Sequence, residues 1–126
     1  MSRYLIDTNI FVDANRGAEL AIKFLSSLNS DINISIVTAL ELLKGAQDKK
    51  AIEKVKGGLD KFNVIYLNEN VQKEGVEIFY KNKLKHGIGI FDSLMAATAI
   101  DKNLILITRN VKHFKEIRGL QAQAPY

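Results

Sequence analysis

The chain has 126 residues, of which 47% are hydrophobic, and its 18 basic and 14 acidic side chains leave a net charge of +4. This length supports one core and is too short for two ordinary domains of roughly 100 to 200 residues each. Without cysteine, disulfides and thiolate ligands are excluded, so any metal site must use oxygen or imidazole. The basic charge favours acidic partners such as nucleic acid without identifying one. We therefore expect a single domain over residues 1–126.

The first residues carry no secretory signal pattern, because an apolar run of only three residues, 4–6, follows the amino terminus. No apolar stretch approaches the roughly 20 residues that span a bilayer. We expect a cytoplasmic protein.

Short aliphatic runs alternate with segments of helical spacing along the chain. The runs at residues 4–6, 32–35, 64–67 and 104–108 show little alternation, which is typical of parallel strands covered on both faces. Apolar residues recur at helical spacing within 20–28, 40–46, 71–80 and 94–100. The pattern predicts an α/β fold, a three-layer sandwich with a small central parallel sheet flanked by helices.

Glycine and charge mark the boundaries between these segments. Gly57 and Gly58 divide the charged stretch 44–61, which favours a solvated helix or helix pair, although contact with RNA or a partner stays open. The tail predicts a weak last strand at 120–122, ended by Pro125.

Three acids stand where strands end or helices begin. Asp7 follows the strand at 4–6 directly, at the carboxyl edge where open α/β sheets carry their sites. Glu41 is expected in the first turn of a helix that starts near Thr38 and to project from the same edge. Asp92 opens a helix whose next turn carries the apolar residue Met95, so its carboxylate needs a partner.

Each acid also has an ordinary structural explanation. Asp7 could be an N-cap, Thr38 and Glu41 match a capping box, and Asp92 could complement a helix dipole. Only a shared site explains all three acids together. Three neighbouring carboxylates repel unless a cation neutralises them or some take up protons. The cluster therefore predicts a bound Mg²⁺ or Mn²⁺, which suits hydrolysis of a phosphodiester.

Several motifs follow one another in a familiar order. They are YLIDTNIFV at 4–12, SIVTALELLKG at 35–45, FDSLMAA at 91–97, LITRN at 106–110 and HF at 113–114. With these motifs the chain resembles the PIN domain family, and in particular the VapC toxins of prokaryotic type II toxin–antitoxin pairs, over nearly its whole length. The resemblance implies a metal-dependent endoribonuclease in which Asp7, Glu41 and Asp92 are the catalytic, metal-binding carboxylates.

The resemblance also assigns supporting roles. Asn9 would support the metal-binding carboxylates without binding the metal itself, and Thr108 would hydrogen-bond to the acidic cluster. Asn110 stands where many relatives carry a fourth acid, which puts the number of metal ions in doubt. The family further implies a homodimer, an RNA substrate and neutralisation by a cognate antitoxin.

Other polar and aromatic residues are less distinctive. Lys44, Arg109 and Lys112 could contact RNA phosphates or form ordinary surface charge. His86 and His113 lack the spacing of a zinc site, and we expect a packing or surface role for His113. Aromatic residues at 4, 11, 24, 79 and 91 are expected in the core, which leaves no exposed platform for stacking bases.

Two other functions remain open. Receiver domains and phosphatases also use acids at strand ends, but they usually show an Asp-Asp or Asp-x-Asp pattern near the first strand, which the spacing of Asp7 and Asp13 does not supply. A non-catalytic PIN-fold module that binds RNA or protein is the second alternative, and Asn110 is its best support.

Overall fold

The structure is a computed structural model that describes residues 3–28 and 32–126, apart from the side chain of His86. The described strands are β1 (Tyr4–Ile6), β2 (Asn33–Ser35), β3 (Asn63–Ile65), β4 (Ile105–Ile107) and β5 (Ala122–Gln123). The described helices are α1 (Thr8–Asn15), α2 (Glu19–Ser27), α3 (Ile36–Gly45), α4 (Lys49–Leu59), α5 (Glu69–His86), α6 (Ile90–Lys102) and α7 (Val111–Phe114). None of these helices is long and apolar enough to cross a membrane.

The strands form one parallel sheet in the order β3-β2-β1-β4-β5. β1 lies in the middle, with Leu5 paired to Asn33 on one side and to Leu106 on the other. The chain therefore leaves β1 towards β2 and later returns to its opposite side as β4. Such a change of direction opens a crevice at the carboxyl ends of the central strands.

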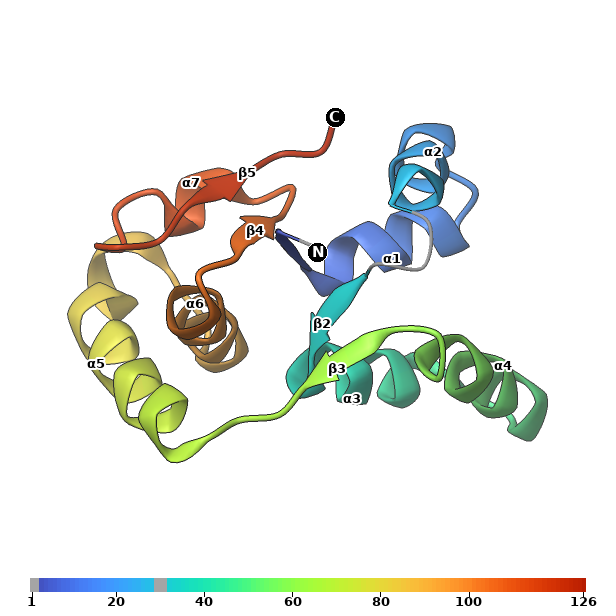
Figure 1. Ribbon diagram of the computed structural model, residues 1–126, viewed down its shortest axis with the longest axis horizontal. Coiled ribbons are helices and arrows are strands. Elements are labelled where there is room, and N and C mark those ends of the chain that lie inside the picture. Colours follow the sequence, from blue (N-terminus) through green and yellow to red (C-terminus); the bar gives the residue numbers. More distant parts are fainter. Residues whose placement is uncertain (1–2, 29–31) are drawn as a thin grey trace.

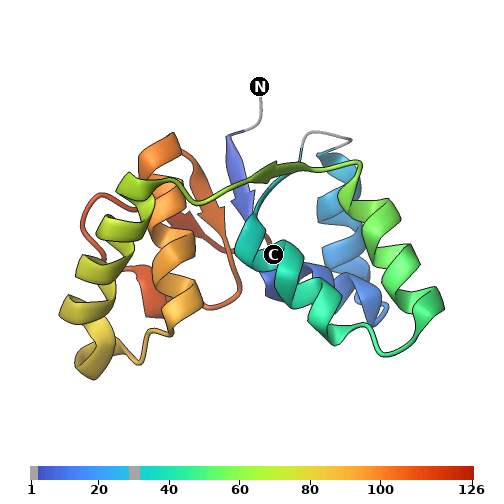
Figure 2. The ribbon, with the colours of Figure 1, turned by 90° about the horizontal axis from the view of Figure 1, so that it is seen from below.

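Helices cover both faces of the sheet, as Figures 1 and 2 show. Successive residues of a strand point to opposite faces, so Leu5 and Leu106 pack with α5, α6 and α7, while Ile6 and Ile107 pack with α1, α2 and α3. All four of these side chains are fully buried. The predicted three-layer α/β sandwich is confirmed.

The expected strands are all present, with one difference in placement. β3 is an edge strand, and its residues Asn63, Val64 and Ile65 are exposed or half-buried. The prediction that all four main strands are central was therefore wrong for β3. The weak tail strand is present as β5, which pairs with β4 at the other edge.

Two helix boundaries also differ from expectation. α3 begins at Ile36, because the Ser35 side chain caps it by accepting a hydrogen bond from the Val37 amide (3.1 Å). α4 continues through Gly57 and Gly58 to Leu59, so this glycine pair does not divide the helix. The charged stretch 44–61 thus forms the end of α3 and the whole of α4.

The close contact between α5 and α6 depends on Gly75. A Cβ atom built at this position would lie 2.8 Å from Cδ2 of Leu94. The missing side chain lets the two helices approach, which fixes α6 and the residues at its first turn.

Candidate active site

The candidate residues gather at the carboxyl edge of the central strands. Asp7 follows β1 and Thr108 follows β4, while Glu41 lies on α3, directly after β2. Asp92 lies in the first turn of α6, and α6 packs against α3 through a contact between the Thr38 hydroxyl and the sulfur of Met95 (3.7 Å). The sheet and two helices thus bring all three acids to one region.

Asp7 is held mainly by side chains, together with the backbone amide of Thr8. Its backbone occupies the N-cap position of α1, but its side chain makes no cap hydrogen bond to the later amides of the first turn. Instead Oδ2 accepts hydrogen bonds from the Thr108 hydroxyl (2.8 Å) and the Asn9 side-chain amide (3.3 Å). The N-cap explanation therefore does not account for this carboxylate.

Burial raises the pKa of Asp7 from 3.8 to about 6. The hydrogen bond from Thr108 lowers this pKa, while the charges of Asp92 and Glu41 raise it further. Within the described residues, no Lys, Arg or His forms an ion pair with Asp7, whose residue exposure is 5%. A buried carboxylate among like charges is a position that a cation would stabilise.

Glu41 is bound by the first residue of α1. Its Oε1 lies 2.7 Å from the Thr8 hydroxyl, which is also 3.0 Å from the hydroxyl of the buried Thr38. Because α3 starts two residues before Thr38, Glu41 lies in the second turn, so the expected first-turn position was wrong and the alternative of a capping box formed by Thr38 and Glu41 does not apply. The half-buried Glu41 side chain is instead tied to the strand end that carries Asp7.

Asp92 keeps part of its expected role at a helix start. Its Oδ2 accepts a long hydrogen bond from the Gly89 amide (3.4 Å). Burial raises the pKa of the Asp92 carboxyl, and the Gly89 amide and the charge of His113 lower it. His113 therefore lies close enough to Asp92 to act on it electrostatically, which we did not predict.

The donor chemistry of these acids matches a hard divalent cation, although their side chains do not converge on one point. Three carboxylates supply oxygen ligands alone, the ligand type that Mg²⁺ and Mn²⁺ prefer. In the described part of the chain, however, no group of three His, Cys, Asp or Glu residues is placed to hold an ion. Thr8 and Gly89 hold Glu41 and Asp92, so an ion would compete with these two donors. The terminal carboxylates can turn about their side-chain bonds, so the present arrangement is compatible with a site that closes around an ion.

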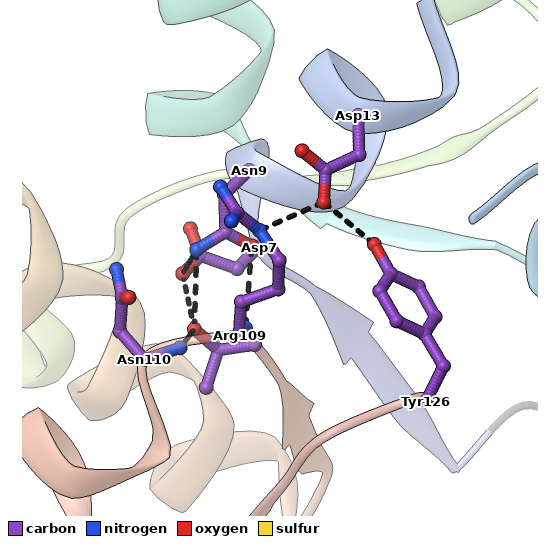
Figure 3. Close-up of polar contacts among 7 residues, drawn as sticks. Asp7, Asn9, Asp13, Arg109, Asn110 and Tyr126 are labelled. Atoms are coloured by element: carbon purple, nitrogen blue, oxygen red, sulfur yellow. Dashed lines mark hydrogen bonds and ion pairs between the residues drawn. The ribbon is translucent and has the colours of Figure 1, made fainter. Parts of the chain in front are cut away.

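The polar residues around Asp7 form a short network (Figure 3). The Asn9 amide contacts both Asp7 and the hydroxyl of Thr108 (3.4 Å), and the Asn9 carbonyl oxygen accepts from the Arg109 backbone amide (3.4 Å). The backbone amide of Asn110 donates to the Thr108 hydroxyl (3.0 Å), while Asn110 itself is exposed. The expected contact of Thr108 with the acidic cluster is thus present, and Asn9 joins it.

The three candidate cations differ in their surroundings. Lys44 and Lys112 are exposed, at the end of α3 and on α7. Arg109 is paired through Nε with Oδ2 of Asp13 (2.7 Å), and Tyr126 donates its phenol hydrogen to the same oxygen (2.7 Å). Figure 3 shows this cluster beside Asn9 and Asp7.

The expectation that aromatic residues 4, 11, 24, 79 and 91 are all in the core was wrong in part. Phe11 is buried, but Phe91 at the start of α6 is 53% exposed. Tyr66 and Tyr80 are also largely exposed, so the described surface does carry aromatic side chains. The buried residues of α6 begin at Ser93, after Phe91.

Sequence reasoning placed Thr108 and Asn9 beside the acidic cluster, where both contact Asp7, but it missed the partners of Glu41 and Asp92. Thr8 and Thr38 stand within the quoted motifs, but the contacts of Thr8 with Thr38 and with Glu41 depend on how α1 meets α3. Asp13 and Tyr126 are 113 residues apart, and no local pattern indicates their contact. The i, i+4 spacing of Asn9 and Asp13 on α1 was the one available signal that both share a helix face.

Comparisons with known proteins agree on the family. Residues 4–120 match the PIN domain. Comparison with curated proteins gives no match.

Solved structures of toxin–antitoxin complexes are similar over the whole chain. One is a toxin–antitoxin complex from Klebsiella pneumoniae, with 29% identity, a TM-score of 0.82 and 98% of each chain covered. Another is VapBC2 from Rickettsia felis bound to a DNA fragment from their promoter, with 31% identity, a TM-score of 0.76, and 96% of this chain and 97% of that chain covered. A third is VapBC-1 from nontypeable Haemophilus influenzae, with 30% identity, a TM-score of 0.78 and 97% of each chain covered.

Proposed function

The chain belongs to the PIN domain family, and we propose that it is a metal-dependent endoribonuclease, the toxin of a VapBC-type toxin–antitoxin pair. The observation that carries this proposal is the buried Asp7 carboxylate, whose pKa of about 6 reflects burial and the nearby charges of Asp92 and Glu41. A site that accumulates unneutralised negative charge is suited to a cation and to a reaction at a phosphodiester.

Asp7, Glu41 and Asp92 would hold Mg²⁺ or Mn²⁺. Such an ion, when bound, lowers the pKa of water and stabilises the charge that develops on a phosphodiester. Thr108 and Asn9 both donate to Oδ2 of Asp7, which orients this carboxylate. Because a ligand carboxylate must be deprotonated, the hydrogen bond from Thr108 also supports binding by lowering the pKa of Asp7.

Cationic residues near the motifs would bind the RNA backbone. Lys44 and Lys112 are exposed and can contribute the sequence-independent part of the affinity. Single-stranded RNA is the substrate class that best fits a site at the surface edge of a sheet, where an unpaired strand can reach the carboxylates.

A cognate antitoxin and a cytoplasmic location follow from the same family assignment. Similar solved chains come from complexes described as toxin–antitoxin, which supports an antitoxin as the partner of this chain. A ribonuclease of this kind meets its RNA in the cytoplasm.

We also propose a homodimer through the outer surface of α5 and α6. Val76, Tyr80 and Leu84 follow one another at helical spacing on α5 and are 66%, 82% and 93% exposed. With Ile90 of α6 they line a mainly apolar hollow of about 600 Å³. Large exposed apolar patches mark association surfaces, and a twofold axis would join two copies of the same patch.

The size of the particle in solution tests this homodimer. Tyr80→Lys is expected to convert it to a monomer in light scattering, while Tyr66→Lys, which changes another largely exposed tyrosine outside the patch, leaves the dimer intact. A wild-type monomer at high concentration would contradict the proposal.

One alternative has structural support. Asn110 replaces a fourth acid, and no three described metal-ligand side chains converge as they stand. A PIN-fold module that binds RNA or protein without cleaving it would show these features. Its prediction is that Mn²⁺ does not bind, whereas the ribonuclease binds Mn²⁺ and loses this binding in Asp7→Asn.

Growth of a bacterial host tests the toxin proposal. Induced expression of the wild-type chain is expected to arrest growth, and Asp7→Asn or Asp92→Asn to restore it at equal soluble protein levels. Arrest by all three proteins would show that the acids are not responsible.

A further inference from the structure

A cluster of three side chains joins distant parts of the chain beside the candidate site. Asp13 of α1 accepts from Arg109, which follows β4, and from Tyr126, which follows β5. Both contacts are 2.7 Å long and end on the same oxygen, Oδ2. The Asp13 side chain is only 16% exposed, whereas that of Arg109 is 48% exposed. The cluster thus has a half-buried acid and an accessible cation.

The cluster is connected to Asp7 through Asn9. The Arg109 backbone amide donates to the Asn9 side chain, which in turn donates to Asp7. Asn9 and Asp13 are four residues apart on α1, so they lie on one helix face about 5 to 6 Å from each other. Figure 3 shows the Arg109 side chain running along this face towards Asp13. The Arg109 guanidinium therefore pairs with Asp13, which lies one helical turn from Asn9, the residue that contacts Asp7.

Arg109 is oriented and still able to bind an anion. A guanidinium has five N–H donors, and the single Asp13 oxygen at Nε leaves others for a second ligand. Tyr126 keeps its proton at neutral pH, as a tyrosine ordinarily does, and burial and Asp13 raise its pKa further to about 12, so it remains a donor that holds Asp13 in place. The causes of the Asp7 pKa shift do not include Arg109. The charge of Arg109 is thus not used to neutralise the carboxylate site.

We propose that Asp13 and Tyr126 are positioning residues that hold Arg109 at the rim of the carboxylate site, where it binds a phosphate of single-stranded RNA next to the scissile bond. The inference rests on the proposed ribonuclease function and adds which residue contacts the RNA backbone and how it is oriented. An ordered guanidinium binds phosphate with less loss of side-chain entropy than a free one.

RNA binding by a variant of changed charge distinguishes a purely structural role of Asp13 from a role in positioning Arg109. If Asp13 only fastens the tail to α1, Asp13→Asn raises the net charge by one unit and RNA binding becomes equal or tighter. If Asp13 positions Arg109, the same change weakens RNA binding in spite of the added positive charge. Asp13→Asn therefore predicts opposite signs for the two roles.

Binding is measured in the Asp92→Asn background, in which the proposed cleavage is lost and the cluster is untouched. The probe is a fluorescent single-stranded RNA followed by anisotropy at several salt concentrations. Arg109→Ala is expected to weaken binding about tenfold and to reduce the slope of log K against log salt by about 0.7, the value for one phosphate of a single strand. Arg118→Ala, which removes an exposed arginine elsewhere, should change binding less than about twofold.

The positioning residues have their own expected results. Asp13→Asn should weaken binding about threefold to tenfold, and Tyr126→Phe about twofold, because Arg109 keeps its charge but loses its fixed orientation. Arg109→Lys should recover the salt slope but only part of the affinity, because lysine lacks the planar fork. Far-ultraviolet circular dichroism and thermal melting of each variant show that the fold is retained.

The outcomes separate this inference from the function on which it rests. Equal or tighter binding by Asp13→Asn, or equal effects of Arg109→Ala and Arg118→Ala, would overturn the inference and leave the ribonuclease proposal standing. The expected pattern of binding, together with no cleavage by the Asp92-containing protein in Mg²⁺ or Mn²⁺, would support the RNA contact and reject catalysis. If the background protein binds no RNA, both are rejected.

Discussion

The hydroxyl group of Thr108 donates a 2.8 Å hydrogen bond to Oδ2 of Asp7, joining the ends of β4 and β1 across 101 residues of chain. This contact opposes the effect of burial on the same carboxyl, because it lowers the pKa that burial raises. The balance leaves Asp7 with a pKa of about 6.

Thr108→Val removes this donor while keeping the shape of the side chain. The pKa of Asp7 is expected to rise further, since a donor that favours the charged form is lost. The acidic limb of the pH profile of RNA cleavage should move to higher pH, and a rise of about one pKa unit gives about a threefold loss at pH 6.5 that shrinks at pH 8.5. Thr108→Ser should restore the wild-type profile. A loss of equal size at every pH would show that Thr108 acts through the fold alone.

Asp7→Asn is expected to stabilise the protein without metal at neutral pH. The folded pKa of about 6 lies above the ordinary value of 3.8, so the folded protein binds more protons between these values and loses stability as pH rises through this window. Removing the charge should recover on the order of 2 kcal/mol at pH 7.5 and little at pH 4. Urea unfolding of both proteins at the two pH values measures the difference. A wild type that gains stability relative to Asp7→Asn as pH rises from 4 to 7.5 would reverse the sign we expect.

Mn²⁺ should stabilise the wild-type protein in a pH-dependent manner. An ion that binds only the folded state adds about 2.7 kcal/mol at a concentration of 100 times its Kd. At pH 5 Asp7 is roughly nine tenths protonated, so the thermal shift caused by Mn²⁺ should fall strongly relative to pH 7.5. Glu41→Gln serves as a matched variant, because its amide oxygen can still accept from Thr8 while the charge is gone. An equal shift in both proteins would remove Glu41 from the proposed metal site.

Two glycines in helices should respond oppositely to substitution. Gly57→Ala in α4 meets no atom within 4 Å and should add about 0.5 to 1 kcal/mol of stability through helix propensity. Gly75→Val places side-chain atoms against Leu94 and should cost about 1 to 3 kcal/mol. Denaturant unfolding compares the two variants with wild type. A stable Gly75→Val protein would show that α5 and α6 can separate at no cost.

The elements that could be predicted are those with a clear local sequence pattern. Buried strands such as β1 and β4 have uninterrupted aliphatic runs, and α6 shows a regular apolar stripe, so each was found near its observed position. The edge position of β3 was not found, because strand order depends on contacts between distant segments. The start of α3 was misplaced because Ser35 and Thr38 are both good N-caps, and only packing selects Ser35.

The candidate site also contains residues that could be predicted from the sequence and residues that could not. Asp7, Glu41 and Asp92 were selected from their places in the chain, since topology alone brings carboxyl ends of parallel strands together. Thr108 and Asn9 were also expected beside the cluster, and both donate to Asp7. The neighbours of the other two acids were not found, because Thr8 reaches Glu41 and His113 approaches Asp92 only after the helices have packed. The cluster of Asp13, Arg109 and Tyr126 has no local signature at all.

Cleavage of a mixed RNA pool tests the central claim most directly. Purified wild-type protein free of antitoxin is incubated with Mg²⁺ or Mn²⁺, beside a reaction with EDTA and beside Asp7→Asn of confirmed fold. The account predicts that only wild type with metal cuts the RNA, and that mapped ends identify the target. Wild type and Asp7→Asn that behave alike under both metals would contradict it and leave a binding module in its place.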